Sequence, residues 1–244
     1  MELAAEDQPV TTPAPSRHEV WKMFDRIAHR YDLLNHFLSL NRDKYWRKKV
    51  ATLLPSGRDL AVLDLATGTG DQLVELYKSG RVSTGVGLDL AEKMLEIGRS
   101  KISSIGLSQK LRLQHGDAGI IPFGENSFDV VSISFGIRNV TDVPNALVEM
   151  RRVLRPGGRA LLLEFSLPGN PLMRSLYLFY FRHVLPLLGG LISGDNIAYR
   201  YLNQTVETFP YGESFCRLMT EAGFTQVAAT PLTFGIATIY QGDK

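Results

Sequence analysis

The chain has 244 residues, 44% of them hydrophobic, which is enough apolar material for the core of one large domain. Its 27 lysines and arginines nearly balance its 25 aspartates and glutamates, and a net charge of +2 disfavours a nucleic-acid binder, which usually carries a basic stripe. The single cysteine, Cys216, excludes an internal disulfide and a zinc site built from several thiolates. The first residues are acidic and lack the apolar stretch of a secretory signal, so we expect a cytoplasmic protein.

The beginning of the chain divides into an arm and two helices. Residues 1–17 hold three prolines among small and polar residues, and we expect a disordered arm. Apolar residues then recur at helical intervals (Val20, Phe24, Ile27), which predicts an amphipathic helix beginning near His18. Residues 42–54 are predicted as a second helix, which ends at a Pro-Ser-Gly turn. Both helices precede the first strand, so they are additions to the core fold.

From residue 59 onward, predicted strands alternate with predicted helices. Strands are expected at 60–66, 83–88, 111–114, 128–134 and 159–164, helices at 72–78, 91–103, 144–154 and 212–222, and a closing hairpin at 226–231 and 234–241. Strands separated by helices of this length indicate βαβ units and a parallel sheet. We therefore expect an α/β fold in one domain over residues 18–244, with a doubly wound, mostly parallel seven-stranded sheet. A long apolar insert, residues 171–201, separates the fifth strand from the last helix.

The turn after the first strand is the most informative local motif. An apolar strand leads directly into Gly68-Thr69-Gly70 and then into a helix. Glycines let the backbone pass close to a ligand, and a helix start offers unpaired N–H groups. Asp89 ends the next strand, where a carboxylate can accept hydrogen bonds from both ribose hydroxyls of a nucleoside. This combination predicts a nucleoside site, with Gly68 and Gly70 in its turn.

The residues around this turn favour S-adenosylmethionine (SAM) over NAD. Leu73 stands where a dinucleotide-binding fingerprint has its third glycine. Asp64 before the turn and Asp71 after it would repel a pyrophosphate, but they suit the ammonium and sulfonium groups of SAM. A sulfonium methyl group is already a strong electrophile, so we expect no metal.

Seven motifs carry a family resemblance. Residues 64–71, 116–118 with 122–123, 127–129 and 152–158 resemble the class I SAM-dependent methyltransferases, which have a Rossmann-like fold. Residues 24–32, 133–140 and 199–202 resemble, more narrowly, the quinone-biosynthesis C-methyltransferases, a family that includes the demethylmenaquinone methyltransferases and their ubiquinone-pathway counterparts. The resemblance covers the chain from residue 18 to its end.

The resemblance implies SAM contacts at Thr69, Asp89, Asp117, Ala118 and Ser134. Asp117 follows the third strand, where its carboxylate can accept a hydrogen bond from the adenine amino group. A turn-forming role for Asp117 is the alternative. Ser134 ends the fourth strand, which borders the ligand crevice of a doubly wound sheet. A plain polar residue at a strand end is the alternative for Ser134.

The resemblance also implies the reaction, which is methyl transfer from SAM to a ring carbon of a prenylated quinol in menaquinone or ubiquinone biosynthesis, most simply from demethylmenaquinol to menaquinol. Loss of a proton from a ring hydroxyl spreads negative charge to that carbon. Arg138 would stabilise the oxyanion, and Asn139 would orient the ring oxygen. The alternative for both is a helix entrance closed by a bond between the arginine and a carboxylate. Arginine keeps its proton at neutral pH and therefore cannot serve as the base. Four candidates for the base stay open: Tyr31, Asp32, His36 and Asp142.

The insert at 171–201 has two interpretations. One is a helix packed into the core, and the other is a helical lid for a polyprenyl tail that also touches the inner face of the membrane, where basic residues favour anionic lipid. The two are compatible. Its longest apolar stretch is interrupted by Arg182, His183 and Pro186, so we do not expect it to span a bilayer. Two other functions stay open, a methyltransferase of another small molecule and a catalytically silent quinone-binding or assembly protein. The sequence also leaves open the acceptor ring and the oligomeric state.

Overall fold

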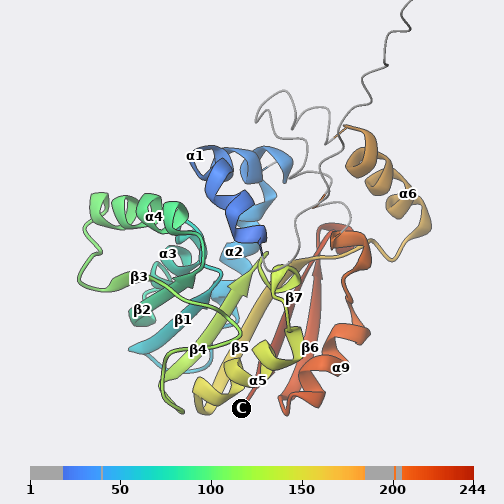
Figure 1. The fold of residues 1–244 in the computed structure, drawn as a ribbon. Helices are drawn as coiled ribbons and strands as arrows, with labels where there is room; N and C mark the ends of the chain where they lie inside the picture. The colour runs from blue at the N-terminus through green and yellow to red at the C-terminus, as the bar shows by residue number, and fades with distance from the viewer. Residues whose placement is uncertain (1–18, 40, 185–200, 202–204) are drawn as a thin grey trace, which may run out of the picture.

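A seven-stranded sheet with the order β3-β2-β1-β4-β5-β7-β6 forms the centre of the molecule (Figure 1). The computed structural model describes residues 19–39, 41–184, 201 and 205–244, and of residues 30–38 the backbone alone. The strands are β1 Leu60–Leu65, β2 Val82–Asp89, β3 Leu111–His115, β4 Phe128–Ser134, β5 Leu154–Phe165, β6 Thr225–Leu232 and β7 Ala237–Asp243. The first five are parallel, and β7 is antiparallel to both β5 and β6. This confirms the doubly wound, mostly parallel seven-stranded sheet.

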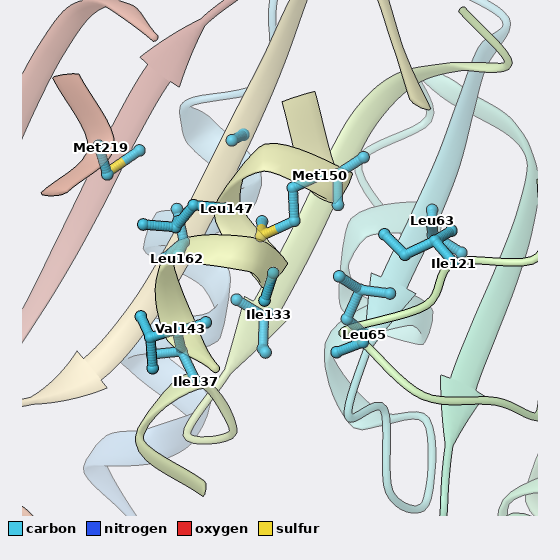
Figure 2. Packing of buried hydrophobic residues seen from close by; sticks show 14 of the residues in the cluster. Leu63, Leu65, Ile121, Ile133, Ile137, Val143, Leu147, Met150, Leu162 and Met219 are labelled. Atoms are coloured by element: carbon cyan, nitrogen blue, oxygen red, sulfur yellow. The ribbon is translucent and has the colours of Figure 1, made fainter. Parts of the chain in front are cut away.

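Helices cover both faces of the sheet because its central strands are apolar on both sides. They are α1 Val20–Leu38, α2 Arg42–Thr52, α3 Asp71–Tyr77, α4 Glu92–Ser104, α5 Val143–Val153, α6 Pro171–Phe179 and α9 Glu213–Glu221. Leu63 and Val131 face one hydrophobic cluster, to which α5 and α9 contribute, whereas Val62 and Val130 face the other, to which α2, α3 and α4 contribute. Figure 2 shows Leu147 and Met150 of α5 packed together with strand residues of the first cluster.

Two predicted boundaries are wrong. β5 begins at Leu154, five residues before the expected start at 159, and this first residue pairs with Phe128 of β4 directly after the end of α5. The closing hairpin has a longer turn than expected, since a 3-10 turn at Thr233–Gly235 separates its strands and β7 begins only at Ala237. Thr233 and Phe234 both have positive φ angles, which non-glycine residues rarely adopt, and this is why the turn was missed.

The N-terminal helices are anchored to distant parts of the chain. Trp46 of α2 donates a hydrogen bond from Nε1 to Oγ1 of Thr233 in the hairpin turn, at 2.8 Å. Ala28 of α1 packs against Ala91 and Met94 of the α4 region. Figure 1 shows α1 and α6 at the same end of the sheet, where the parallel strands have their carboxyl ends. The expected arm at 1–17 and residues 185–200 of the insert lie outside the described residues. Within the described ranges, no helix has both the length and the apolar character needed to cross a membrane.

Candidate functional site

A cavity lies at the carboxyl ends of the parallel strands, where the strand order reverses between β1 and β4. A doubly wound sheet binds its ligand at this switch point. Each of the first four strands, or the turn after it, contributes to the wall, and α1 and α4 complete it. The lining residues are Val20, Trp21, Phe24, Ala66, Gly68, Asp89, Leu90, Met94, Gly116, Asp117, Ala118, Ser134, Phe135, Gly136, Asn139, Val140 and Thr141.

This cavity brings together six of the ten predicted site residues. They are Gly68, Asp89, Asp117, Ala118, Ser134 and Asn139. The aromatic side chains of Trp21 and Phe24 were not expected in its wall. The available signal was the apolar face of the first helix, which sequence reasoning assigned only to packing.

The Asp89 carboxylate is held rigidly in the wall. Its Oδ2 accepts a hydrogen bond from the backbone N–H of Gly68 and its Oδ1 accepts one from that of Ala91, each at 2.8 Å. Burial raises the pKa of Asp89, and the two N–H groups oppose that rise. Each carboxylate oxygen keeps a lone pair for a further donor. Asp89 can therefore still accept hydrogen bonds from the hydroxyl groups of a ligand.

Asp64 lies beneath the turn and is not among the lining residues. Its oxygens accept hydrogen bonds from the hydroxyls of Ser132 and Thr67, both at 2.6 Å. Burial raises the pKa of Asp64 to about 6. The carboxylate therefore braces the turn, and its predicted contact with the cofactor stays a prediction.

Thr69 and Gly70 also lie outside the cavity lining. Lys101 of α4 donates from Nζ to Thr69 Oγ1 at 3.0 Å and forms an ion pair with Asp71 at 2.7 Å. The charge of Asp71, which the sequence argument assigned to a ligand, is thus compensated by a side chain of the protein. Gly70 precedes α3 with φ of 82°, a conformation that favours glycine.

Asp117 combines its two expected roles. Its Oδ1 accepts a hydrogen bond from the N–H of Gly119 at 2.8 Å, which is the turn-forming role, and the residue also lines the cavity. Ser134 donates from Oγ to Gln72 Oε1 at 3.1 Å, and Gln72 in turn donates from Nε2 to the backbone oxygen of Arg47 at 3.4 Å. These bonds connect the cavity wall to α2.

Asn139 carries a buried amide oxygen, Oδ1, with no hydrogen-bond partner in the described part of the chain. Because the residue also lines the cavity, this oxygen can accept a hydrogen bond from a ligand there. An orphaned acceptor in the wall fits a ligand that carries a hydroxyl or an ammonium group.

Arg138 lies behind the wall in a buried cluster. Its Nη1 donates to Glu164 Oε1 at 2.5 Å and to the backbone oxygen of Phe135 at 2.8 Å. Its guanidinium also lies over the ring of Phe165. Burial raises the pKa of Glu164, and the Arg138 charge opposes that rise. This is the bond between an arginine and a carboxylate that the alternative interpretation expected at the entrance after β4.

Three of the four candidate bases, Tyr31, Asp32 and His36, have side chains outside the described residues. The fourth, Asp142, caps α5 by accepting a hydrogen bond from the N–H of Asn145 at 3.0 Å. The choice of base therefore stays open. Among the residues that the structure describes, no group of three or more His, Cys, Asp or Glu is placed to hold a metal ion.

Comparison with protein families and curated proteins finds close similarity over nearly the whole chain. Residues 13–244 match the model of the ubiE/COQ5 methyltransferase family. The demethylmenaquinone methyltransferase of Thermus thermophilus is 46% identical over 222 residues, 91% of this chain and 100% of that protein. That of Bacteroides fragilis is 39% identical, with 97% of each chain covered. The ubiquinone/menaquinone biosynthesis C-methyltransferase UbiE of Geobacter sulfurreducens is 44% identical, with 91% of this chain and 87% of that protein covered.

Solved structures share the fold at lower identity. A SAM-dependent methyltransferase of Thermotoga maritima, described as a possible histamine N-methyltransferase, has a TM-score of 0.65 at 21% identity, covering 92% of this chain and 99% of that one. A putative SAM-dependent methyltransferase of Methanococcus maripaludis has a TM-score of 0.62 at 17% identity, covering 98% and 97%. These similarities support the class I methyltransferase fold expected from the sequence.

Proposed function

Because the chain belongs to the ubiE/COQ5 methyltransferase family, we propose that it methylates a ring carbon of a prenylated quinol in menaquinone or ubiquinone biosynthesis, with SAM as the methyl donor. The observation that carries this proposal is 39–46% identity, over more than nine-tenths of the chain, to proteins with these activities in their names. The relatives carry both demethylmenaquinone and ubiquinone/menaquinone names, so the acceptor is a naphthoquinol or a benzoquinol.

The cavity residues suit the adenosine part of SAM. Asp89 would accept hydrogen bonds from the ribose hydroxyls, Asp117 would accept one from the adenine amino group, and the turn at Gly68 would allow close backbone approach. SAM supplies an activated methyl group when bound. The chain's own residues then have to align the acceptor, exclude water and take up one proton.

Asn139 and the aromatic wall suit the acceptor ring. The Asn139 amide would hold the ring hydroxyl through its unpartnered oxygen, which fixes the ring relative to the methyl donor. Trp21 and Phe24 of α1 would cover the cavity and exclude water. Arg138 is a positioning residue in this proposal, because its charge is already paired with Glu164 and its bond to Phe135 holds the turn that carries Asn139.

The exposed face of α6 suits contact with the membrane that dissolves a prenylated quinol. Leu172, Leu176 and Phe179 are 69%, 57% and 62% exposed, and their spacing places them on one face of the helix. On the other side, Tyr177 packs with Phe181 in a buried cluster that fixes the helix to the domain. The apolar face would dip into the lipid surface and bring the acceptor's tail close to the cavity.

The test is methyl transfer from methyl-labelled SAM to short-tailed demethylmenaquinol and to the matching demethylated benzoquinol, under reducing conditions. We expect label on the ring carbon of at least one acceptor. The oxidised quinone is the control, since it has no hydroxyl proton to lose and should stay unlabelled. Binding of SAM and quinol without transfer to either ring would contradict the proposal and favour a silent quinone-binding protein.

A further inference from the structure

Arg47 of α2 is a buried arginine that contacts no counter-charge among the described residues. The residue is only 9% exposed, and its Nε is buried with no hydrogen-bond partner. Within the ranges that the structure describes, its guanidinium contacts a ring, that of Phe135, at 5.5 Å from the centroid, and has no ion pair. Removing a charge from water without pairing it is costly, so a buried charged side chain is normally paired with a group of opposite charge.

Arg138, a second buried arginine, differs from Arg47 in having a carboxylate partner. Arg47 lies over the ring of Phe135 and Arg138 over that of Phe165, and the centroids of these two rings are 4.6 Å apart. Arg138 is paired with the buried carboxylate of Glu164. Arg47 has no equivalent, although the two guanidinium groups are buried to a similar degree.

One candidate for a counter-charge is the buried carboxylate of Asp64, but no hydrogen bond joins it to the Arg47 side chain. The Arg47 charge acts on Asp64 from a distance and favours its ionised form. Both Asp64 oxygens, however, accept hydrogen bonds from hydroxyls of Ser132 and Thr67. Asp64 therefore compensates part of the Arg47 charge, and Nε of Arg47 still has no hydrogen-bond partner among the described residues.

Arg47 lies beside the cavity, at its β4 end. Phe135, which its guanidinium contacts, lines the cavity, and so does Ser134, which is tied to the Arg47 backbone through Gln72. Asp89 ends β2 and Asp117 follows β3, on the other side of β1. With adenosine held at Asp89 and Asp117, the amino-acid end of SAM would extend toward β4 and Arg47.

We propose that Arg47 binds the α-carboxylate of the methionyl end of SAM, an inference that rests on the proposed function. A carboxylate supplies the missing counter-charge, and the planar guanidinium matches it in shape. Arg47 would thereby help select ligands that carry the amino-acid end over nucleosides that lack it.

The test compares two ligands on the full-length chain by calorimetry. S-adenosylhomocysteine carries the carboxylate, whereas 5′-methylthioadenosine lacks the entire amino-acid end. We expect Arg47→Met to weaken binding of S-adenosylhomocysteine about ten- to a hundredfold, the range for a charge-assisted hydrogen bond, and to leave 5′-methylthioadenosine within about twofold. Arg47→Lys should fall between Arg47→Met and the wild type, because it keeps the charge and loses the planar fork.

The melting temperature without ligand tests the unpaired charge of Arg47 independently of ligand binding. Arg47→Met should melt at or above the wild-type temperature, because the substitution removes an unpaired buried charge. The matched control is Arg159→Met, which removes the ion pair with Asp243 away from the cavity. That variant should melt lower and keep both affinities.

If the wild type binds S-adenosylhomocysteine, two results would contradict this inference and leave the proposed function intact. One is unchanged binding of this ligand by Arg47→Met, and the other is an equal loss for both ligands. A wild-type chain that binds neither ligand would instead contradict the proposed function, and this inference with it.

Discussion

Arg138 and Glu164 form an ion pair of 2.5 Å between two side chains that are almost completely buried, at the ends of β4 and β5. The arginine also holds the backbone of Phe135, which has a positive φ of 58°. The pair therefore stabilises an unusual turn directly beside the cavity. Removing one member would leave the other charge buried without a partner.

The first prediction distinguishes a structural role of Arg138 from a direct role in catalysis. Arg138→Ala should lower the free energy of unfolding by about 3–5 kcal/mol, the usual cost of breaking a buried ion pair. The double variant Arg138→Met with Glu164→Leu should regain most of that loss, because no unpaired charge remains. If Arg138 only positions the turn, methyl transfer by the double variant should return to within about tenfold of the wild type, since a single preorganised donor is worth a hundredfold or more. Urea unfolding and single-turnover rates measure both quantities.

A stable double variant that stays a hundredfold or more below the wild-type rate would contradict the positioning role. It would instead support direct stabilisation of the quinol oxyanion by the Arg138 charge.

The second prediction concerns Asp89. Asp89→Ala should weaken binding of SAM by about 1.5–3 kcal/mol, because the ribose hydroxyls would lose a charged acceptor. The control is Asp129→Ala. That carboxylate also accepts a backbone N–H, from Ala61, but it lies near the start of β4 and outside the cavity lining. Calorimetry should show a loss for Asp89→Ala alone, and no heat when NAD is added to the wild type.

The third prediction concerns Asn139, whose amide oxygen has no partner among the described residues. Asn139→Ala should slow methyl transfer by about a hundredfold, the cost of losing one preorganised group, with little change in melting temperature. SAM affinity should stay within a few fold of the wild type. A large drop in melting temperature would instead assign Asn139 to the architecture of the turn.

The fourth prediction tests α6 at the membrane. Leu176→Glu combined with Phe179→Glu should reduce co-flotation with anionic lipid vesicles about tenfold or more, since each change places a charge where lipid contact needs an apolar group. The control is Val148→Glu on α5, another exposed apolar position, at 50% exposure. Transfer to a short-tailed quinol in solution should be unaffected by the double change. Equal loss of flotation in the control would contradict a specific role for α6.

The fifth prediction follows from the raised pKa of Asp64, about 6 in the folded chain against an ordinary 3.8. Between these values the folded chain binds more protons than the unfolded chain, so the contribution of this group to stability falls as pH rises from about 4 to 6. Asp64→Asn removes that slope. Relative to the wild type, its free energy of unfolding should rise by about 2.4 kcal/mol between pH 4 and pH 7. Urea unfolding at several pH values measures the difference, and two parallel profiles would contradict it.

Sequence patterns predicted the strands of the sheet and the part of the cavity wall that the strand ends form. β1, β2 and β4 were predicted to within about two residues of their ends, because their apolar runs are bounded by turn residues. The strand-end rule for doubly wound sheets then located Asp89 and Ser134 correctly in the cavity wall. Both predictions depended on local pattern and on the order of strands and helices.

The rest depended on packing between distant segments. The charge argument gave Asp64 and Asp71 to a ligand, and it did not predict that the hydroxyls of Thr67 and Ser132 and the ammonium group of Lys101 also bind them. Arg47 was missed because nothing in residues 42–54 marks it. Its burial arises only when α2 docks against the sheet, and a sequence pattern carries no information about that docking.

The Trp46–Thr233 hydrogen bond, between residues 187 positions apart, has a consequence for the order of events during synthesis. Trp46 leaves the ribosome long before Thr233, so α2 lacks this hydrogen bond until the hairpin turn has been made. In a nascent chain that stops short of the hairpin, the helix that carries Arg47 is therefore held less firmly beside Phe135. Protection of stalled nascent chains from proteolysis by S-adenosylhomocysteine should therefore increase once residue 233 has emerged.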